Sequence, residues 1–236
     1  MTIQLTAAST GTPDPAPVAQ FWARLLDRPL TSGPAGMTVP GKQDELSLRW
    51  AADSAPAVDA DRWHLHVTSS SYPDQQDVVA KALDLGASHL DVGQRPEEGH
   101  IVLADPAGSA FCLIEPYNAF LEGCGLLGEL ACKGTRIVGL FWSAALEWPL
   151  VWDQDEETAI QSPRGGPKMA WGGPQTMAPK TMPNRQRLVL ATDGPSGLST
   201  EIDRLVGLGA TQLQTNPDGT VEMADPDGNE FWVTSS

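Results

Sequence analysis

Hydrophobic residues near the start of the chain recur at the spacing of one helical face. Five apolar side chains fall at positions i, i+3, i+4, i+7 and i+8: Val18, Phe21, Trp22, Leu25 and Leu26. This spacing is typical of a helix that buries one stripe against a core. Asp14 followed by Pro15 is a helix-start signal, because aspartate caps the first N–H groups and proline is tolerated in the first turn. The pattern predicts a helix that begins near Pro15.

The same apolar stripe returns 120 positions later. Its members are Val138, Phe141, Trp142, Ala145 and Leu146. The surrounding decapeptide FWARLLDRPL at Phe21–Leu30 is matched by FWSAALEWPL at Phe141–Leu150. We interpret the Phe-Trp pair in each copy as core packing against a sheet, in preference to a contact with a ligand.

Two further landmarks repeat in the same order. The octapeptide ADPAGSAF at Ala104–Phe111 returns as ADPDGNEF at Ala224–Phe231, again 120 positions later. Between the landmarks, Leu-Gly-Ala at 85–87 returns at 208–210. A period of this length is the size of a small domain, so the sequence predicts two copies of one domain.

Shorter patterns divide each copy into two units. Apolar positions predict a second helix in each copy, and the predicted C-terminal stops are Gly86 and Gly209. The Asp-Pro-x-Gly turns predict hairpins, since Asp caps such a turn, Pro presets φ and Gly takes the positive φ. The predicted strands are 3–7, 46–50, 101–104, 111–114, 126–131, 150–152, 158–160, 168–171, 220–224 and 231–234.

These elements give a βαβββ unit that occurs four times. We expect an α+β protein with domains at residues 1–118 and 122–236, joined by the stretch Tyr117–Gly125. The Pro- and Gly-rich segment Gln161–Asn184 is interpreted as a crossover between the two units of the second copy.

Composition narrows the classes of partner. The chain has 236 residues and a net charge of −15, which argues against nucleic acid and anionic membranes as partners. The N-terminal residues lack the pattern of a secretory signal, and the three cysteines have no CxxC spacing, so we expect a cytoplasmic protein with reduced thiols. A homodimer is left open.

Paired βαβββ units that close on Leu-Gly-Ala and Ala-Asp-Pro-x-Gly-x-x-Phe resemble the vicinal oxygen chelate superfamily, which includes glyoxalase I, bleomycin-resistance proteins and extradiol dioxygenases. The resemblance covers nearly the whole chain and is closest to tandem glyoxalase-like proteins. It implies that paired units form a half-barrel cup around a ligand. In metal-dependent members it implies a His on the strand that opens the second unit and a Glu four residues after the turn glycine.

In the first copy, the resemblance places His64 at the His position and Cys112 at the Glu position. His66 is two residues from His64, so both can face the same way, and His100 is expected on a neighbouring strand. Such a set would suit a divalent cation, zinc above all, with Fe, Ni or Mn also open. We favour the alternative that the histidines are hydrogen-bonded in a pocket and that no metal is bound. Glu115 is expected on the face opposite Cys112.

In the second copy, Arg187 stands at the His position and Trp232 at the Glu position. Neither is a metal ligand, so no metal is expected there. We predict a cup in the first copy lined by His64, His66 and Cys112. A second cup, in the second copy, is predicted from the remaining candidates Arg187, Val189 and Trp232, where a cation beside an aromatic ring suits an anionic or carbonyl-rich aromatic ligand. The alternative is that Arg187 only forms an ion pair with one of the many carboxylates of the chain.

Two functions stay open at this point. The first is a metal-independent protein that holds a flat or carbonyl-rich molecule, as bleomycin-resistance proteins do. The second is an enzyme, either a lyase or isomerase or an oxygenase such as a dioxygenase, with His64 as the catalytic residue. The acidic run Asp153–Glu157 lacks the spacing of a calcium loop and is interpreted as a hairpin turn.

Overall fold

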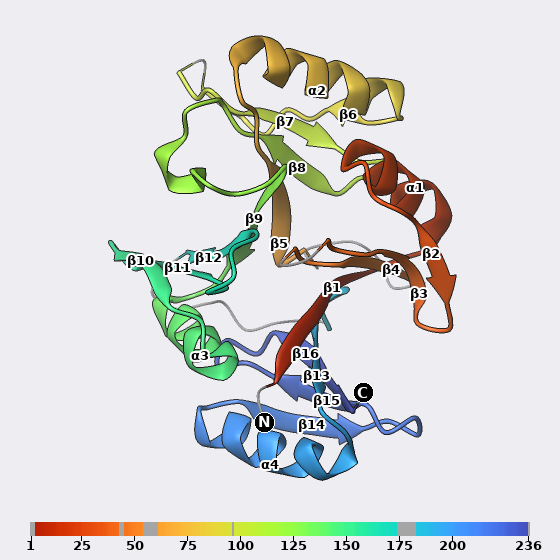
Figure 1. The fold of residues 1–236 in the computed structure, drawn as a ribbon, viewed down its shortest axis with the longest axis vertical. Helices are drawn as coiled ribbons and strands as arrows, with labels where there is room; N and C mark the ends of the chain where they lie inside the picture. The colour runs from red at the N-terminus through yellow and green to blue at the C-terminus, as the bar shows by residue number, and fades with distance from the viewer. Residues whose placement is uncertain (1–2, 43–44, 54–60, 96, 174–182, 236) are drawn as a thin grey trace.

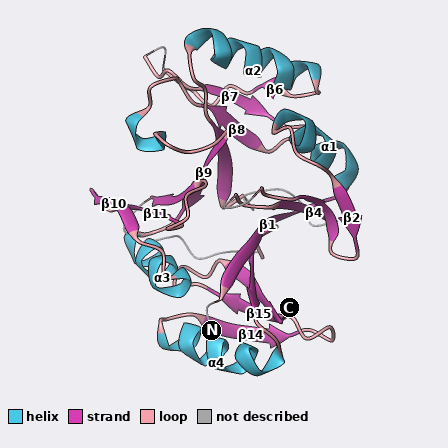
Figure 2. Ribbon diagram, viewed as in Figure 1, coloured by secondary structure: helices cyan, strands magenta, loops and turns pink. Residues whose placement is uncertain are grey.

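The computed structural model describes residues 3–42, 45–53, 61–95, 97–173 and 183–235. It has a mixed α+β fold of four βαβββ units (Figures 1 and 2). Unit 1 comprises β1 (Gln4–Thr12), α1 (Pro15–Leu25), β2 (Thr31–Gly33), β3 (Gly36–Val39) and β4 (Leu48–Ala52). Unit 2 comprises β5 (Trp63–Val67), α2 (Tyr72–Asp84), β6 (Ser88–His89), β7 (Ile101–Ala104) and β8 (Ala110–Leu113).

The second repeat has the same order of helices and strands. Unit 3 comprises β9 (Leu127–Lys133), α3 (Arg136–Leu146), β10 (Leu150–Gln154), β11 (Glu157–Gln161) and β12 (Lys168–Gly172). Unit 4 comprises β13 (Gln186–Thr192), α4 (Pro195–Gly207), β14 (Thr211–Thr215), β15 (Val221–Ala224) and β16 (Glu230–Ser235). A short 3-10 helix, Ala119–Leu121, lies in the linker between the repeats. Among the helices that the structure describes, none is long and apolar enough to cross a membrane.

Local predictions about the helices are confirmed. Asp14 caps α1 by accepting a hydrogen bond from the backbone N–H of Ala16, with proline in the first turn. Gly86 and Gly209 follow the C-caps of α2 and α4 with φ values of 105° and 113°, which favour glycine. The acidic run forms the β10–β11 turn, where Asp155 and Glu156 have positive φ.

Strand β12 lies inside the segment 161–184 and confirms the strand predicted at residues 168–171, because Met169 and Trp171 bury one face of it. The interpretation of the rest of the segment as a crossover falls partly on residues 174–182, which lie outside the described part of the chain.

The two eight-stranded sheets join units from different repeats. Sheet A has the order β14-β15-β16-β13-β1-β4-β3-β2 and unites units 4 and 1. Sheet B has the order β10-β11-β12-β9-β5-β8-β7-β6 and unites units 3 and 2. Helices pack on one face of each sheet, and we call the opposite faces the sheet-A cup and the sheet-B cup (Figure 1).

This topology corrects the expectation that each repeat encloses its own cup. The first strands of the units pair antiparallel across the repeats, β1 with β13 and β5 with β9, so both cups are shared by the two repeats. The boundaries 1–118 and 122–236 mark the two repeats in the sequence. That each of these segments is a separate domain remains a prediction.

A buried tryptophan–aspartate hydrogen bond links the two units of each repeat. The Trp22 indole N–H on α1 donates to Asp105 Oδ2 at 3.0 Å, and Trp142 on α3 donates to Asp225 Oδ2 at 3.3 Å. The other oxygen of each carboxylate accepts two backbone N–H groups of the Asp-Pro turn. The prediction that Trp22 and Trp142 are core residues is confirmed, since each is 2% exposed.

Burial of the Asp225 carboxyl predicts a pH effect on stability. Burial raises the pKa of Asp225 to about 6, and its hydrogen-bond donors offset only part of this rise. The native state therefore holds a proton that the unfolded state releases near pH 4, so stability falls as the pH rises through about 6.

We expect wild type to lose about 2–3 kcal/mol relative to Asp225→Asn between pH 4 and pH 7, because the amide does not titrate. Urea unfolding of both proteins across this pH range measures the difference. A difference in unfolding free energy that stays constant with pH would show that the carboxyl is not perturbed.

Candidate functional site

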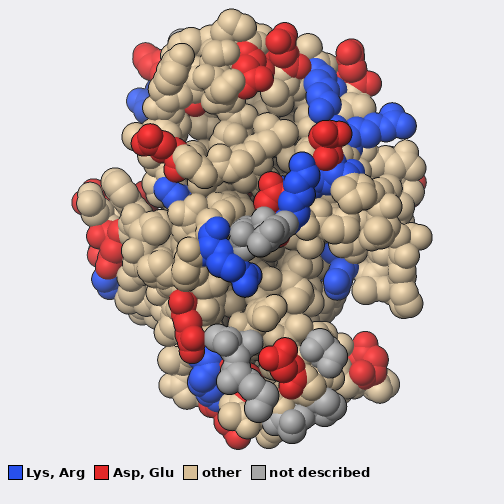
Figure 3. Space-filling model, viewed as in Figure 1, with Lys and Arg blue, Asp and Glu red and all other residues tan. Residues whose placement is uncertain are grey.

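A cavity of about 540 Å³ occupies the sheet-B cup. Residues of both repeats line it, as expected from a sheet that both repeats build. Its polar residues include His64, His66 and Glu129, and its aromatic residues are Phe120, Trp152 and Trp171. The outer surface in Figure 3 has interspersed acidic and basic side chains and no continuous basic face in this view.

Strand alternation places both histidines in this cup. Leu65 and Val67 of β5 are buried in the core below the sheet, so His64 and His66 project from the opposite face. Their rings lie with centroids 4.7 Å apart, and His66 Nε2 is 2.8 Å from His64 Nε2.

Glu129 completes a hydrogen-bonded chain from the other repeat. It lies on β9 directly opposite His66 of β5, and its Oε2 is 2.6 Å from His66 Nδ1. Glu129 is 6% exposed, so its carboxylate is shielded from water and needs a partner. The chain Glu129–His66–His64 therefore has its acidic end in one repeat and its histidines in the other.

The two imidazoles have opposite pKa shifts. Burial alone would lower the pKa of His66, but hydrogen bonds to Cys112 and Glu129 and their charges raise it to about 9. Burial lowers the pKa of His64 to about 4, assisted by the positive charges of His66, Lys133 and His100. At neutral pH His66 is an imidazolium and His64 is neutral.

The protonation states of the two histidines determine which ring nitrogens carry a proton. The imidazolium of His66 donates from Nδ1 to Glu129 and from Nε2 to His64, so His64 must accept at Nε2 and carry its own proton on Nδ1. Among the described residues, none accepts a hydrogen bond from His64 Nδ1. Because His64 lines the cavity, this N–H is the donor that the chain offers to a ligand.

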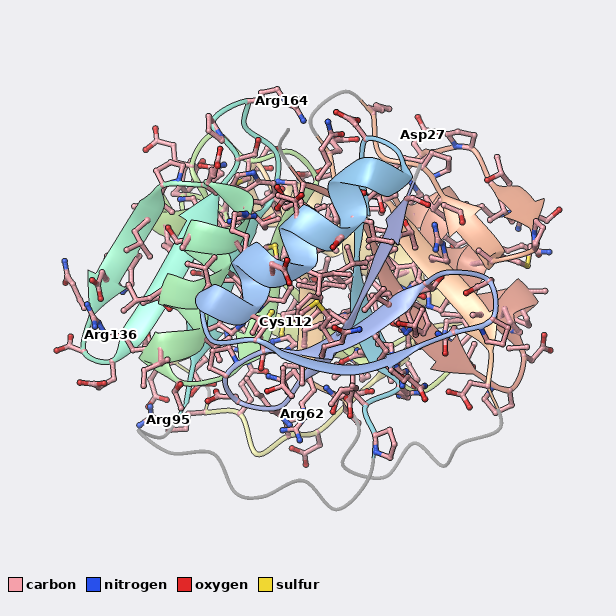
Figure 4. All side chains as sticks on the ribbon, turned by 90° about the horizontal axis from the view of Figure 1, so that it is seen from below. Asp27, Arg62, Arg95, Cys112, Arg136 and Arg164 are labelled. Carbon is pink, nitrogen blue, oxygen red and sulfur yellow. The ribbon has the colours of Figure 1, made fainter. Side chains whose placement is uncertain are left out.

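Cys112 lies beside the histidines, next to His66 in register on β8. Its Sγ and ring nitrogens of His64 and His66 all lie within 4.8 Å of one another. Figure 4 shows Cys112 in the interior of the molecule, and it packs with Val102, Ile114 and Leu121. Its neighbours Phe111 and Leu113 belong to the core between helices and sheet, so Cys112 lies on the cup face, although it is not among the residues that line the cavity.

The other predicted residues of the first copy lie at the rim. His100 precedes β7 and lines the cavity, but it is not part of the three-residue group formed by His64, His66 and Cys112. Glu115 lies past the end of β8, where it lines the cavity and accepts a hydrogen bond from Asn118.

The predicted residues of the second copy lie in the sheet-A cup. Arg187, Val189 and Trp232 alternate with the core residues Leu188, Leu190, Phe231 and Val233. The Arg187 guanidinium is 5.0 Å from the centroid of Trp232 and forms an ion pair with Glu222 at 3.2 Å. The structure thus divides the predicted residues between two cups and gives Arg187 a partner within the chain.

Sequence reasoning missed Glu129 and the aromatic wall. Glu129 was detectable as the only acidic residue within the mostly apolar strand Leu127–Lys133, but its partner depends on pairing across the repeats. Phe120 of the linker meets Trp152 of β10 edge to face at 6.1 Å. Lys168 donates to the backbone carbonyl of Phe120 and lies 4.5 Å over its ring.

Comparisons with known proteins agree with the repeat. The family model for the glyoxalase-like domain matches residues 6–114 and 129–234. Among curated proteins, none matches the chain.

Three solved structures illustrate the similarity in fold. Glyoxalase I from Zea mays superposes with a TM-score of 0.67 at 13% sequence identity, and the match covers 99% of this chain and 92% of the maize chain. A variant of the maize enzyme has a TM-score of 0.69 at 13% identity, with the same coverage. A candidate dioxygenase from Bacillus subtilis has a TM-score of 0.61 at 9% identity and covers 99% of this chain and 85% of its own.

The Glu129–His66 pair should also make the free energy of unfolding depend on pH. The raised pKa of His66 means that the pair stabilises the native state fully below the ordinary histidine pKa and that this contribution is lost as the pH rises through about 9. Glu129→Gln should lower the free energy of unfolding at pH 6 by about 1–3 kcal/mol, because a buried charge-assisted hydrogen bond is lost.

This loss should shrink above pH 9, and urea unfolding in the presence of a chelator measures it. Glu157→Gln is the control, because Glu157 lies exposed at the rim of the same cavity. An equal loss at all pH values would contradict a charged His66.

Proposed function

Because the chain belongs to the glyoxalase-like domain family, whose model matches most of both repeats, we propose that it binds a small, flat, carbonyl-bearing organic molecule in the sheet-B cup, without a metal ion. The observation that carries this proposal is the hydrogen-bonded chain Glu129–His66–His64 at a cavity of about 540 Å³. A cavity of this size accommodates a drug-sized ligand.

The walls of the cavity favour a flat apolar body. Trp152 and Phe120 are in edge-to-face contact at the cavity, and Trp152 is 40% exposed, so its ring offers surface to a ligand. Aromatic rings gain from stacking as well as from the burial of area. Ala131, Ala159 and Ala170 also line the cup, and their small side chains leave room for the ligand.

The polar end of the ligand is an acceptor. His64 Nδ1–H is the donor without a partner, and its neighbour is the imidazolium of His66. A positive charge next to a donor favours an oxygen with high electron density, such as a conjugated carbonyl. Lys133, which also lines the cavity, adds positive charge on the same side.

Tropolone is a suitable ligand for the test, since it is flat and carries a carbonyl beside a hydroxyl. Titration by calorimetry should show saturable binding that a chelator does not change. His64→Phe removes the donor and keeps a ring, so we expect about ten-fold weaker binding. Trp152→Ala should weaken binding a few-fold.

The control is His89→Phe, because His89 is exposed on β6. If tropolone binds wild type, His64→Phe and Trp152→Ala equally well, the ligand site is not in this cup.

A second candidate function is favoured by one specific observation. His64, His66 and Cys112 each offer a ligand atom, a ring nitrogen or Sγ, and these atoms lie within 4.8 Å of one another, while Glu129 engages His66 through Nδ1. A carboxylate on the far nitrogen is the usual support of a metal-bound histidine. Two imidazoles and a thiolate suit zinc or a similar borderline cation, so this donor set fits a divalent metal.

His64, His66 and Cys112 would hold the ion, and Glu129 would orient His66. The ion would act as a Lewis acid on vicinal oxygens of a substrate, which is the chemistry of a glyoxalase-like lyase, an isomerase or a dioxygenase. The residues themselves would have to release protons from His66 and Cys112 and separate the two Nε2 atoms from their present 2.8 Å contact.

Metal analysis distinguishes the two functions. Protein purified without a chelator and without an affinity tag should contain far less than one metal ion per chain if the first proposal holds, and its thermal stability should not change with added zinc. Stoichiometric metal that disappears in Cys112→Ser and in His66→Gln would favour the metal-dependent enzyme instead.

A further inference from the structure

Arg49 places a cation in the sheet-A cup. Its neighbours on β4, Leu48 and Trp50, are buried in the core at 2% and 4% exposure. Strand alternation therefore projects Arg49 from the opposite face, which is the face of the cup. Its register partners are Ser9 on β1 and Thr38 on β3.

Among the residues that the structure describes, no carboxylate pairs with the guanidinium of Arg49. Its Nε is shielded from solvent and makes no hydrogen bond, and the described part of the chain gives Arg49 no ion pair. Burial lowers the pKa of Arg49, with no carboxylate that raises it. Shielded polar atoms in proteins are normally hydrogen-bonded, so the shielded Nε of this half-buried guanidinium indicates a partner that the described residues do not provide.

Arg28 provides a comparison within the same repeat. Arg28 is buried at 7% exposure, and it forms an ion pair with Glu45 at 3.1 Å and donates to the Leu46 carbonyl at 3.1 Å. The chain has 30 acidic and 15 basic residues, so carboxylates outnumber cations. Arg49, which is half-buried, differs from Arg28 in having no ion pair within the described part of the chain.

The repeat shows that the first strand of sheet A brings no carboxylate to Arg49. Ser9 on β1 is in register with Arg49, is 2% exposed and lies 120 positions before Glu129 of β9. On sheet B, Glu129 is the carboxylate that pairs with the imidazole of His66 on the neighbouring strand. Sheet A therefore has a serine on its first strand where sheet B has a carboxylate.

Arg187, the other arginine of this cup discussed above, already has a partner within the chain. It is the next residue across the sheet from Ser9, but its guanidinium is bound to Glu222 and lies over Trp232. Arg187 is thus neutralised within the chain, and Arg49 is the cation that remains for a ligand.

We propose that the sheet-A cup is a second binding site, specific for a small organic carboxylate that forms a two-point ion pair with Arg49. A guanidinium presents two parallel N–H groups that match the two oxygens of a carboxylate. Ser9 lies beside Arg49 and provides a hydroxyl at the edge of the site. This site is separate from the sheet-B cup and does not depend on the function proposed there.

Benzoate and its neutral analogue benzamide test the proposal. The Nε–Hε signal of Arg49 in a ¹⁵N correlation spectrum, at constant ionic strength, reports directly on the guanidinium. Benzoate should shift this signal in a saturable way, and benzamide should bind about ten-fold more weakly or not at all.

Three variants make the test specific. Arg49→Gln should abolish benzoate binding in calorimetry, and Arg49→Lys, which keeps the charge without the fork, should weaken it several-fold. Arg95→Gln should leave it unchanged, because the Arg95 side chain is 79% exposed and lies at the periphery in Figure 4. His64→Phe should also leave it unchanged.

Several results would overturn the proposal. They are an Arg49 signal that does not respond to benzoate, equal binding of benzoate and benzamide, and benzoate binding that survives Arg49→Lys and Arg49→Gln. Inorganic phosphate that shifts the signal where benzoate does not would show an anion site of a different class.

Discussion

The antiparallel pairing of β5 with β9 is the interaction on which the candidate site depends. It sets Glu129 of the second repeat opposite His66 of the first, and the 2.6 Å contact between them follows from this register. A shift by one residue would send Glu129 to the core face, where a carboxylate has no partner. The sheet-B cup therefore exists only when both repeats are folded and paired.

Each repeat is held together by a different interaction, a buried carboxylate between a helix and a hairpin turn. Trp22 on α1 meets Asp105 in the β7–β8 turn, and Phe111 after that turn packs edge to face on the same indole at 5.0 Å. Trp142, Asp225 and Phe231 repeat this arrangement. These bonds fix sheet A against sheet B, because α1 belongs to one sheet and the turn to the other.

Local features of the fold could be predicted from the sequence, and long-range pairing could not. The helix stripes, the helix stops and the hairpin turns depend on residues close in the chain, and the structure confirms them. Strand alternation is also a local property, and it puts His64, His66, Arg187 and Trp232 on the faces opposite the buried core residues of their strands. Nothing in the repeat indicates which units share a sheet, so Glu129, the partner of His66 from the other repeat, was missed. A carboxylate partner for Arg187 was one of the two alternatives, but the sequence did not identify it as Glu222.

The two cups are related by the repeat but differ in how their charges are balanced. In the sheet-B cup, Glu129 compensates the imidazolium of His66, and the donor left for a ligand is the neutral ring of His64. In the sheet-A cup, Glu222 compensates Arg187, and Arg49 lacks an acid. A cup whose charges are balanced favours a neutral acceptor, whereas a cup with one uncompensated cation favours an anion. The two cups share one order of elements, but Ser9 stands in the first strand of sheet A where Glu129 stands in the first strand of sheet B, and this difference contributes to their different electrostatics.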